Sequence, residues 1–253
     1  GIDETDFSNA VDRVIAGLEK KNKIISPKEK KVIAYHEAGH AVVSWLVEHA
    51  SPLVKVSVVP RGETLGAAWY LPEERQITTT PQIEDELCAA LGGRAAEEMI
   101  FGQISTGALN DLEKVTKQAY AMVSVYGLSE KIGNRSYYDP NGQEYQFTKP
   151  YSDKTAREID EEAGRIIEET YERAKKIIKE NRERLSELAE KLLDEEVIFK
   201  EDLEKAFGKK NGSDDAEGKD KASEDTNGKT ENGQESKEER SVPEEPPPSS
   251  STE

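Results

Sequence analysis

Apolar residues recur at helical spacing along most of the chain. The first such run, from about Asp3 to Lys21, predicts an amphipathic helix. Ser26 and Pro27 have the chemistry of a helix cap followed by proline at the first helical position, and they predict a second helix that reaches Val47. Further helices are expected over residues 81–101 and 106–126, from Ser152 onward, and in short pieces up to Phe207.

Two short segments have the pattern of strands instead. Leu53 to Val59 is rich in valine and lies between two prolines, and Leu65 to Leu71 follows the turn at Arg61-Gly62. The glycines, asparagines and aromatic residues from Gly127 to Tyr151 favour a loop or a small hairpin. The predicted fold class is therefore mainly α with a small β-sheet.

The charge is strongly acidic and unevenly distributed. The 253 residues carry 35 Lys+Arg against 52 Asp+Glu, a net charge of −17, which argues against a duplex nucleic-acid partner. No run approaches the roughly 18 to 20 apolar residues that cross a bilayer, so the chain is expected to be a soluble piece. Residues 209–253 hold 13 acidic and 7 basic side chains and almost no apolar ones, which predicts a disordered acidic tail.

One short pattern carries chemistry. His36 and His40 lie four residues apart in His36-Glu37-Ala38-Gly39-His40, so a helix places both imidazoles on one face with Glu37 beside them. This spacing suits a catalytic zinc ion, which takes three protein ligands and lowers the pKa of a bound water to about 7. Glu37 is then the natural general base. The plainer alternative is an amphipathic helix that happens to carry two histidines.

The third ligand has to be a carboxylate, because no further histidine is suitably placed. Spacing leaves Glu97, Glu98 and Asp111 open as candidates. His49 is interpreted as a helix C-terminal cap or a surface residue. The single cysteine, Cys88, lies in the apolar phase of a helical run and is interpreted as a buried free thiol rather than a nucleophile.

Several blocks together resemble the peptidase domain of the FtsH family, which are membrane-anchored, ATP-dependent zinc metalloproteases. The resemblance covers about residues 2–208. The matching blocks are Gly17-Leu18-Glu19-Lys20-Lys21, Val32 to Ala41 around the histidine pair, Val56 to Gly62, Leu91 to Glu98, Phe101-Gly102 with Ser105 to Ala108, and Tyr151-Ser152.

The resemblance implies roles for individual residues. His36, His40 and Asp111 become the ligands of one zinc ion per chain, with Glu37 as the base. Glu97 and Glu98 remain the second choice for the third ligand. They are interpreted rather as groups that hydrogen-bond to the metal ligands, or as partners of Arg94. Leu65 to Leu71 corresponds to an edge strand that an extended substrate joins. The family often has tyrosine at Ala67 and glutamine at Trp69, and these departures put side-chain pockets there in doubt.

The resemblance also implies a domain organisation. Residues 1–21 correspond to the last helix of an AAA+ ATPase lid, residues 22–208 to the zinc peptidase domain, and residues 209–253 lie outside it. No Gly-x-x-x-x-Gly-Lys-Ser/Thr loop occurs in the sequence, so ATP is expected only through an ATPase module missing from this chain. A membrane anchor, also missing here, would hold the peptidase domain on the cytoplasmic or mitochondrial matrix side.

The function that the resemblance implies is hydrolysis of peptide bonds in unfolded or membrane-extracted proteins by a homohexamer. The zinc ion would activate a water molecule, and Glu37 would take its proton. The alternative is a non-catalytic hexamerisation module with a structural metal site. A metallo-aminopeptidase is the weakest possibility, because no acidic cluster for a substrate amine is recognisable.

Overall fold

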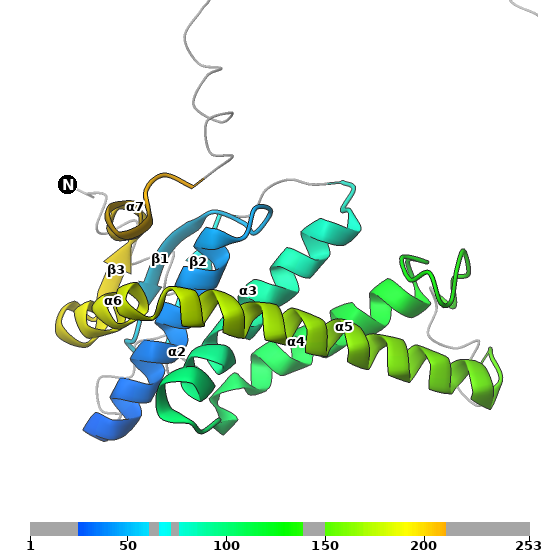
Figure 1. Cartoon of the computed structure of the whole chain (residues 1–253), viewed down its shortest axis with the longest axis horizontal. Helices are drawn as coiled ribbons and strands as arrows, with labels where there is room; N and C mark the ends of the chain where they lie inside the picture. Colours follow the sequence, from blue (N-terminus) through cyan, green and yellow to red (C-terminus); the bar gives the residue numbers. More distant parts are fainter. Residues whose placement is uncertain (1–24, 61–65, 72–75, 139–149, 211–253) are drawn as a thin grey trace, which may run out of the picture. The chain divides into compact units, whose positions relative to one another are not determined.

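The computed structural model describes residues 25–60, 66–71, 76–138 and 150–210 (Figure 1). The predicted first helix and the acidic tail beyond Lys210 lie outside the described residues, as does part of the predicted loop or hairpin. The elements run in the order α2 (Pro27–Leu46), β1 (Leu53–Ser57), β2 (Ala67–Tyr70), α3 (Thr80–Phe101), the 3-10 turn η1 (Thr106–Ala108), α4 (Leu109–Ser124), α5 (Asp153–Glu180), α6 (Arg182–Glu195), β3 (Val197–Phe199) and α7 (Lys200–Phe207).

The start of α2 follows directly from its sequence. The Ser26 hydroxyl accepts a hydrogen bond from the backbone N–H of Glu29, and the Glu29 carboxylate accepts one from the backbone N–H of Ser26. This reciprocal pair satisfies N–H groups that have no partner within the helix, and Pro27 needs none. Residues Ala34 to Trp45 are all buried, so α2 passes through the interior of the domain.

The closest helix contact lies between α2 and α3. A Cβ added to Gly39 would lie 2.4 Å from the carbonyl oxygen of Gly92, and one added to Gly92 would lie 2.6 Å from the carbonyl oxygen of Gly39. Two glycines therefore bring the backbones together where any side chain would force them apart. Helix α5 runs across α2, α3 and α4 and contacts all three (Figure 1).

The sheet has three antiparallel strands in the order β2-β1-β3. Val56 pairs with Ala68 on one side and with Ile198 on the other, and Val56 and Ile198 are fully buried. Helix α2 contacts β1 and β2, and α6 and α7 contact β3. A bulge between Leu53 and Lys55 lets Lys55 pair with Trp69, whose ring lies 5.0 Å from the lysine nitrogen. Among the described strands, β2 has one edge without a neighbour.

The predicted fold class, mainly α with a small sheet, is confirmed. Helix α5 begins at the Ser152 cap as expected, and 106–126 is confirmed as a short 3-10 turn followed by α4. Two details differ from the prediction. Helix α2 ends at Leu46 with Val47 as its cap, so His49 is not the helix cap; its side chain is 33% exposed, which agrees with the surface alternative, and its backbone N–H donates to Asp85. Strand β3 was missed because three residues between two helices are too short for a period-two pattern.

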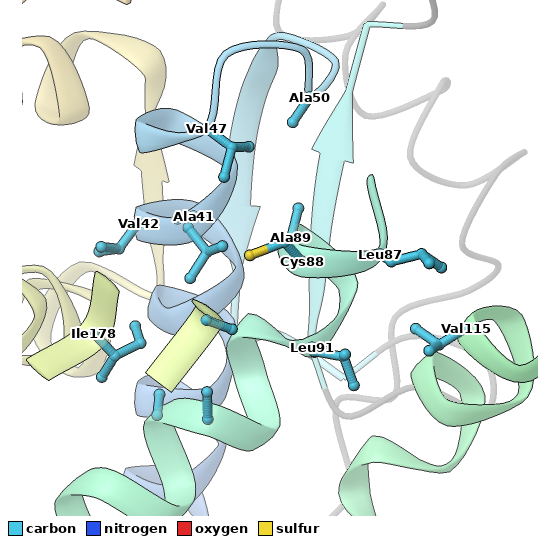
Figure 2. Close-up of a cluster of buried hydrophobic side chains, with 14 of the residues drawn as sticks. Ala41, Val42, Val47, Ala50, Leu87, Cys88, Ala89, Leu91, Val115 and Ile178 are labelled. Atoms are coloured by element: carbon cyan, nitrogen blue, oxygen red, sulfur yellow. The ribbon is translucent and has the colours of Figure 1, made fainter. Parts of the chain in front are cut away.

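A cluster of buried apolar side chains joins α2, α3, α4 and α5 (Figure 2). Figure 2 shows Cys88 inside it, among Ala41, Ala89 and Leu91. Burial raises the pKa of the Cys88 thiol to about 12, although Arg173 acts in the opposite direction. A thiol that is both buried and protonated at neutral pH is no nucleophile, so the prediction of a buried free thiol is confirmed.

Candidate metal centre

Three ligand atoms converge between α2 and the first turn of α4. His36 Nε2 and His40 Nε2 are 3.0 Å apart, and Asp111 Oδ2 lies 3.3 Å from the first and 3.5 Å from the second. Both histidines are buried, and Asp111 is the one part-exposed member of the group. The structure thus brings together the three residues that the sequence resemblance pointed to as ligands.

The opposite nitrogen of each imidazole is held by an acceptor. His36 Nδ1 lies 2.6 Å from Glu97 Oε1, and His40 Nδ1 lies 2.9 Å from the carbonyl oxygen of Ala89. A carbonyl and a carboxylate can only accept, so both Nδ1 atoms carry the proton. In the neutral imidazoles, both Nε2 atoms then present lone pairs toward Asp111. Three electron-rich atoms that face one another are held together by a positive charge between them, either a proton or a metal ion.

The distances fit zinc. Metal–ligand lengths of about 2.0 to 2.1 Å in a tetrahedral site place the ligand atoms about 3.3 Å apart. The three separations of 3.0, 3.3 and 3.5 Å bracket that value. Two imidazoles and one carboxylate are also a donor set that zinc uses in catalytic sites, where one position stays open.

Gly93 on α3 leaves the room that an ion needs. A Cβ added there would lie 2.6 Å from both His36 Nε2 and His40 Nε2. Any side chain at this position would therefore occupy the space directly in front of the two nitrogens. The glycine is in the helical region of the backbone, so its small size, not its conformational freedom, accounts for its presence.

Glu37 lies beside this centre and is almost fully buried. A Cβ added to Gly66, just before β2, would lie 2.7 Å from Glu37 Oε1, so the strand begins directly against the carboxylate. Burial raises the pKa of Glu37 above its usual value, and the two neighbouring histidines reduce that increase only in part. A raised pKa suits a group that has to accept and return a proton near neutral pH.

The pKa shifts of the candidate ligands also favour a positive charge at this site. In the metal-free chain, burial by itself would lower the pKa of His36, but the adjacent Asp111 and Glu97 carboxylates outweigh it and raise the pKa to about 10. Burial would raise the pKa of Asp111, but the two neighbouring histidines lower it well below its usual range. These groups thus favour a positive charge among them, which a divalent cation could supply in place of a proton.

The two glutamates that remained open as ligands have other partners. Glu97 is buried and bridges two elements, since Oε1 binds His36 and Oε2 accepts a hydrogen bond of 2.7 Å from the backbone N–H of Ser105. Glu98 accepts a hydrogen bond from Tyr171 and lies 3.7 Å from the Lys175 nitrogen. The interpretation of Glu98 as a partner of Arg94 therefore finds no support in these contacts.

Sequence reasoning missed three contributors to the centre. The roles of Gly93 and Gly66 depend on which side chains lie near them in the folded structure, so the sequence does not show them. A glycine pair inside a helical pattern, such as Gly92-Gly93, indicates only in general that another part of the chain approaches closely. The role of the Ala89 carbonyl could not be predicted from the sequence, because every residue has a backbone carbonyl. Only the way the helices cross brings this one to His40.

Comparison with known proteins decides the family. Residues 23–206 match the sequence model of peptidase family M41. The chain belongs to peptidase family M41. The resemblance to the FtsH peptidase domain is thereby confirmed, as is the prediction that the domain is a metalloprotease.

Relatives of this M41 chain carry consistent names. It is 61% identical over 209 residues to an ATP-dependent zinc metalloprotease FtsH of Parabacteroides distasonis, covering 83% of this chain and 31% of that protein. It is 51% identical over 205 residues to ATP-dependent zinc metalloprotease FTSH 3, mitochondrial, of Arabidopsis thaliana, with coverages of 81% and 25%. It is 46% identical over 209 residues to the mouse mitochondrial inner membrane m-AAA protease component AFG3L1, with coverages of 83% and 26%.

The M41 chain spans between a quarter and a third of the length of these three relatives. No helix among the described residues combines the length and the apolar character that a bilayer crossing requires.

Proposed function

We propose that this M41 chain is the zinc endopeptidase part of an ATP-dependent membrane protease. The observation that carries the proposal is the convergence of His36 Nε2, His40 Nε2 and Asp111 Oδ2 within 4.8 Å of one another, beside the buried Glu37. These three residues would hold one zinc ion per chain. A zinc ion bound there would supply Lewis-acid polarisation of a peptide carbonyl and of a water molecule.

The remaining chemistry belongs to the protein's own groups. In this proposal Glu37 would accept a proton from the attacking water and return it to the departing amine. Its burial keeps bulk water from competing for its oxygens, and the lack of a side chain on Gly66 lets the start of β2 pack directly against Oε1. Glu97 and the Ala89 carbonyl hold the imidazoles in the tautomer that leaves both Nε2 lone pairs available.

The substrate would bind as an added strand at the open edge of β2. An extended peptide paired there would pass Gly66 and therefore Glu37 Oε1. Main-chain hydrogen bonds supply affinity without reading side chains, which suits a protease acting on many unfolded sequences.

The wider context is proposed from the relatives' names. We infer an attached AAA+ ATPase that delivers unfolded or membrane-extracted proteins, and membrane attachment through segments outside this chain. A homohexamer is part of this proposal, and the molar mass of the intact protein in solution tests it. In this scheme residues 1–21 belong to the ATPase lid, residues 22–208 to the peptidase domain, and residues 209–253 form a separate tail.

The deciding experiment combines metal analysis with a protease assay on an unfolded protein such as casein. The parent chain is expected to hold one zinc ion, and Glu37→Gln is expected to keep zinc and fold while losing about 10²- to 10⁴-fold in rate. Glu187→Gln, the same change at an exposed position of α6, is the matched control and should retain full activity.

Either of two results would contradict the proposal. A chain that binds no zinc at stoichiometric level has no catalytic metal centre. A chain that binds zinc but cleaves nothing, with Glu37→Gln indistinguishable from the parent, would favour the non-catalytic hexamerisation module with a structural metal site.

A further inference from the structure

The last described residues return to the helix that carries the histidines. The indole N–H of Trp45 donates to the carbonyl oxygen of Gly208 at 3.1 Å. Lys210 Nζ donates to the carbonyl oxygens of Ser44, at 2.9 Å, and Ala50, at 2.5 Å. We call residues 208–210 the C-terminal latch. The M41 match ends at residue 206, so the latch lies outside the part that the family defines.

The backbone carbonyls near the end of α2 need hydrogen-bond donors from outside the helix, and the latch supplies them. The last carbonyls of a helix have no partner within it, and α2 has no basic residue in its last turn. The Val43 carbonyl is satisfied by the backbone N–H of Val47. The Ser44 and Ala50 carbonyls belong to residues that are 1% and 5% exposed, so water is a poor substitute there.

Lys210 brings a positive charge to this negative helix end. Its ammonium group joins the last turn of α2 to the turn that leads into β1, and Trp45 fixes the chain on the other side. A charge-assisted hydrogen bond to a buried carbonyl is stronger than a neutral one. The latch therefore restrains both ends of the α2–β1 connection.

We propose that Lys210 is a positioning residue for the metal centre. His40 lies one helical turn before Ser44, and its orientation depends on α2 staying pressed against the Ala89 carbonyl of α3. Loss of the latch frees the last turn of α2, and the loosened turn holds His40 less firmly. The link to catalysis rests on the proposed zinc function, whereas the latch itself rests on the contacts alone.

The test compares Lys210→Met with Lys209→Met, which removes an adjacent charge from an exposed side chain. Backbone hydrogen exchange over residues 41–50 is measured in the metal-free chain. Lys210→Met is expected to exchange about tenfold faster, the effect of losing roughly one charged hydrogen bond. Lys209→Met should match the parent, and Lys210→Arg should restore protection, because arginine keeps the charge and the donors.

A second readout separates positioning from mere stability. Zinc release to a chelator is followed well below the melting temperature, where every variant is folded. Faster release from Lys210→Met, but not from Lys209→Met, is expected. Trp45→Phe keeps an aromatic side chain but removes the N–H donor and part of the buried indole. It provides a second variant if Lys210→Met does not fold, and it should show the same two effects.

Two results would overturn the inference. Equal exchange in Lys210→Met and Lys209→Met would show that the contacts restrain nothing. Faster exchange with unchanged zinc release would show a latch without a positioning role. A parent chain that binds no zinc would contradict the proposed function instead, and the metal-free exchange experiment would still report on the latch.

Discussion

Replacing Gly93 by alanine should separate metal binding from folding. The added Cβ would lie 2.6 Å from both Nε2 atoms, far inside van der Waals contact and close to where a zinc ion would sit at about 2.0 to 2.1 Å from each nitrogen. Alanine in a helix is otherwise favoured over glycine by about 1 kcal/mol. In the metal-free protein this gain offsets part of the strain, so Gly93→Ala is expected to fold.

The size of the expected stabilisation follows from the linkage between zinc binding and folding. A metal present at about 1,000 times its dissociation constant stabilises a folded protein by about 4 kcal/mol. For a domain of this size, 1 kcal/mol corresponds to about 2 to 4 °C, so zinc should raise the melting temperature of the parent by about 8 to 16 °C. Gly93→Ala should show almost none of this increase, because its ligands cannot reach the ion together.

The assay is thermal unfolding with and without buffered zinc. Gly164→Ala is the matched control, because a Cβ at this exposed helical glycine of α5 meets nothing within 4 Å. The free energy of unfolding of Gly164→Ala should increase by about 1 kcal/mol, and zinc should raise its melting temperature as much as that of the parent. A Gly93→Ala chain that responds to zinc as strongly as the parent would refute the assignment of the site.

Three further outcomes are expected. Glu97→Gln should weaken zinc binding about 10- to 100-fold in a chelator competition titration, because it loses the charge that holds His36, and unchanged affinity would contradict this role. The pKa of Glu162 is lowered by hydrogen bonds from Arg165 and Ser129 against the opposing effect of burial, so its contribution to stability is present above pH 4.5 and lost as the pH falls. The difference in melting temperature between metal-free parent and Glu162→Gln should therefore shrink below pH 4.5, and a constant difference would argue against it. Cys88 should react with iodoacetamide only after denaturant is added, as intact-mass measurement would show, whereas rapid labelling of the folded chain would contradict its burial.

The helices and the histidine pair were predictable because their signals are local. The Ser26 capping box and the four-residue spacing of His36 and His40 are fixed by neighbours along the chain, so they can be read without knowledge of the tertiary fold. Spacing could not select Asp111 over Glu97, because Glu97 lies on α3 and Asp111 beyond it, and only packing determines how far either residue ends up from the histidines. The family resemblance, not physical reasoning from spacing, made that choice.

The missed features depend on how helices cross. Nothing at Ala89 distinguishes its carbonyl from any other, and the crossing of α2 and α3 at Gly39 and Gly92 is what brings it to His40. The latch was equally hidden, since Lys210 reads as the start of a polar tail and its two acceptors are backbone atoms far away in the sequence.

The proposed ligands lie on α2 and α4, with α3 between them in the chain, and this arrangement has a consequence for biogenesis. A growing polypeptide exposes the two histidines first, and a bare histidine pair binds zinc weakly. Asp111 lies beside them only in the assembled fold, in which α3 packs against α2 through Gly39 and Gly92. Firm retention of zinc at the proposed site would thus mark a correctly assembled core, and misfolded copies would release their metal to a chelating dye, whereas native copies would retain it.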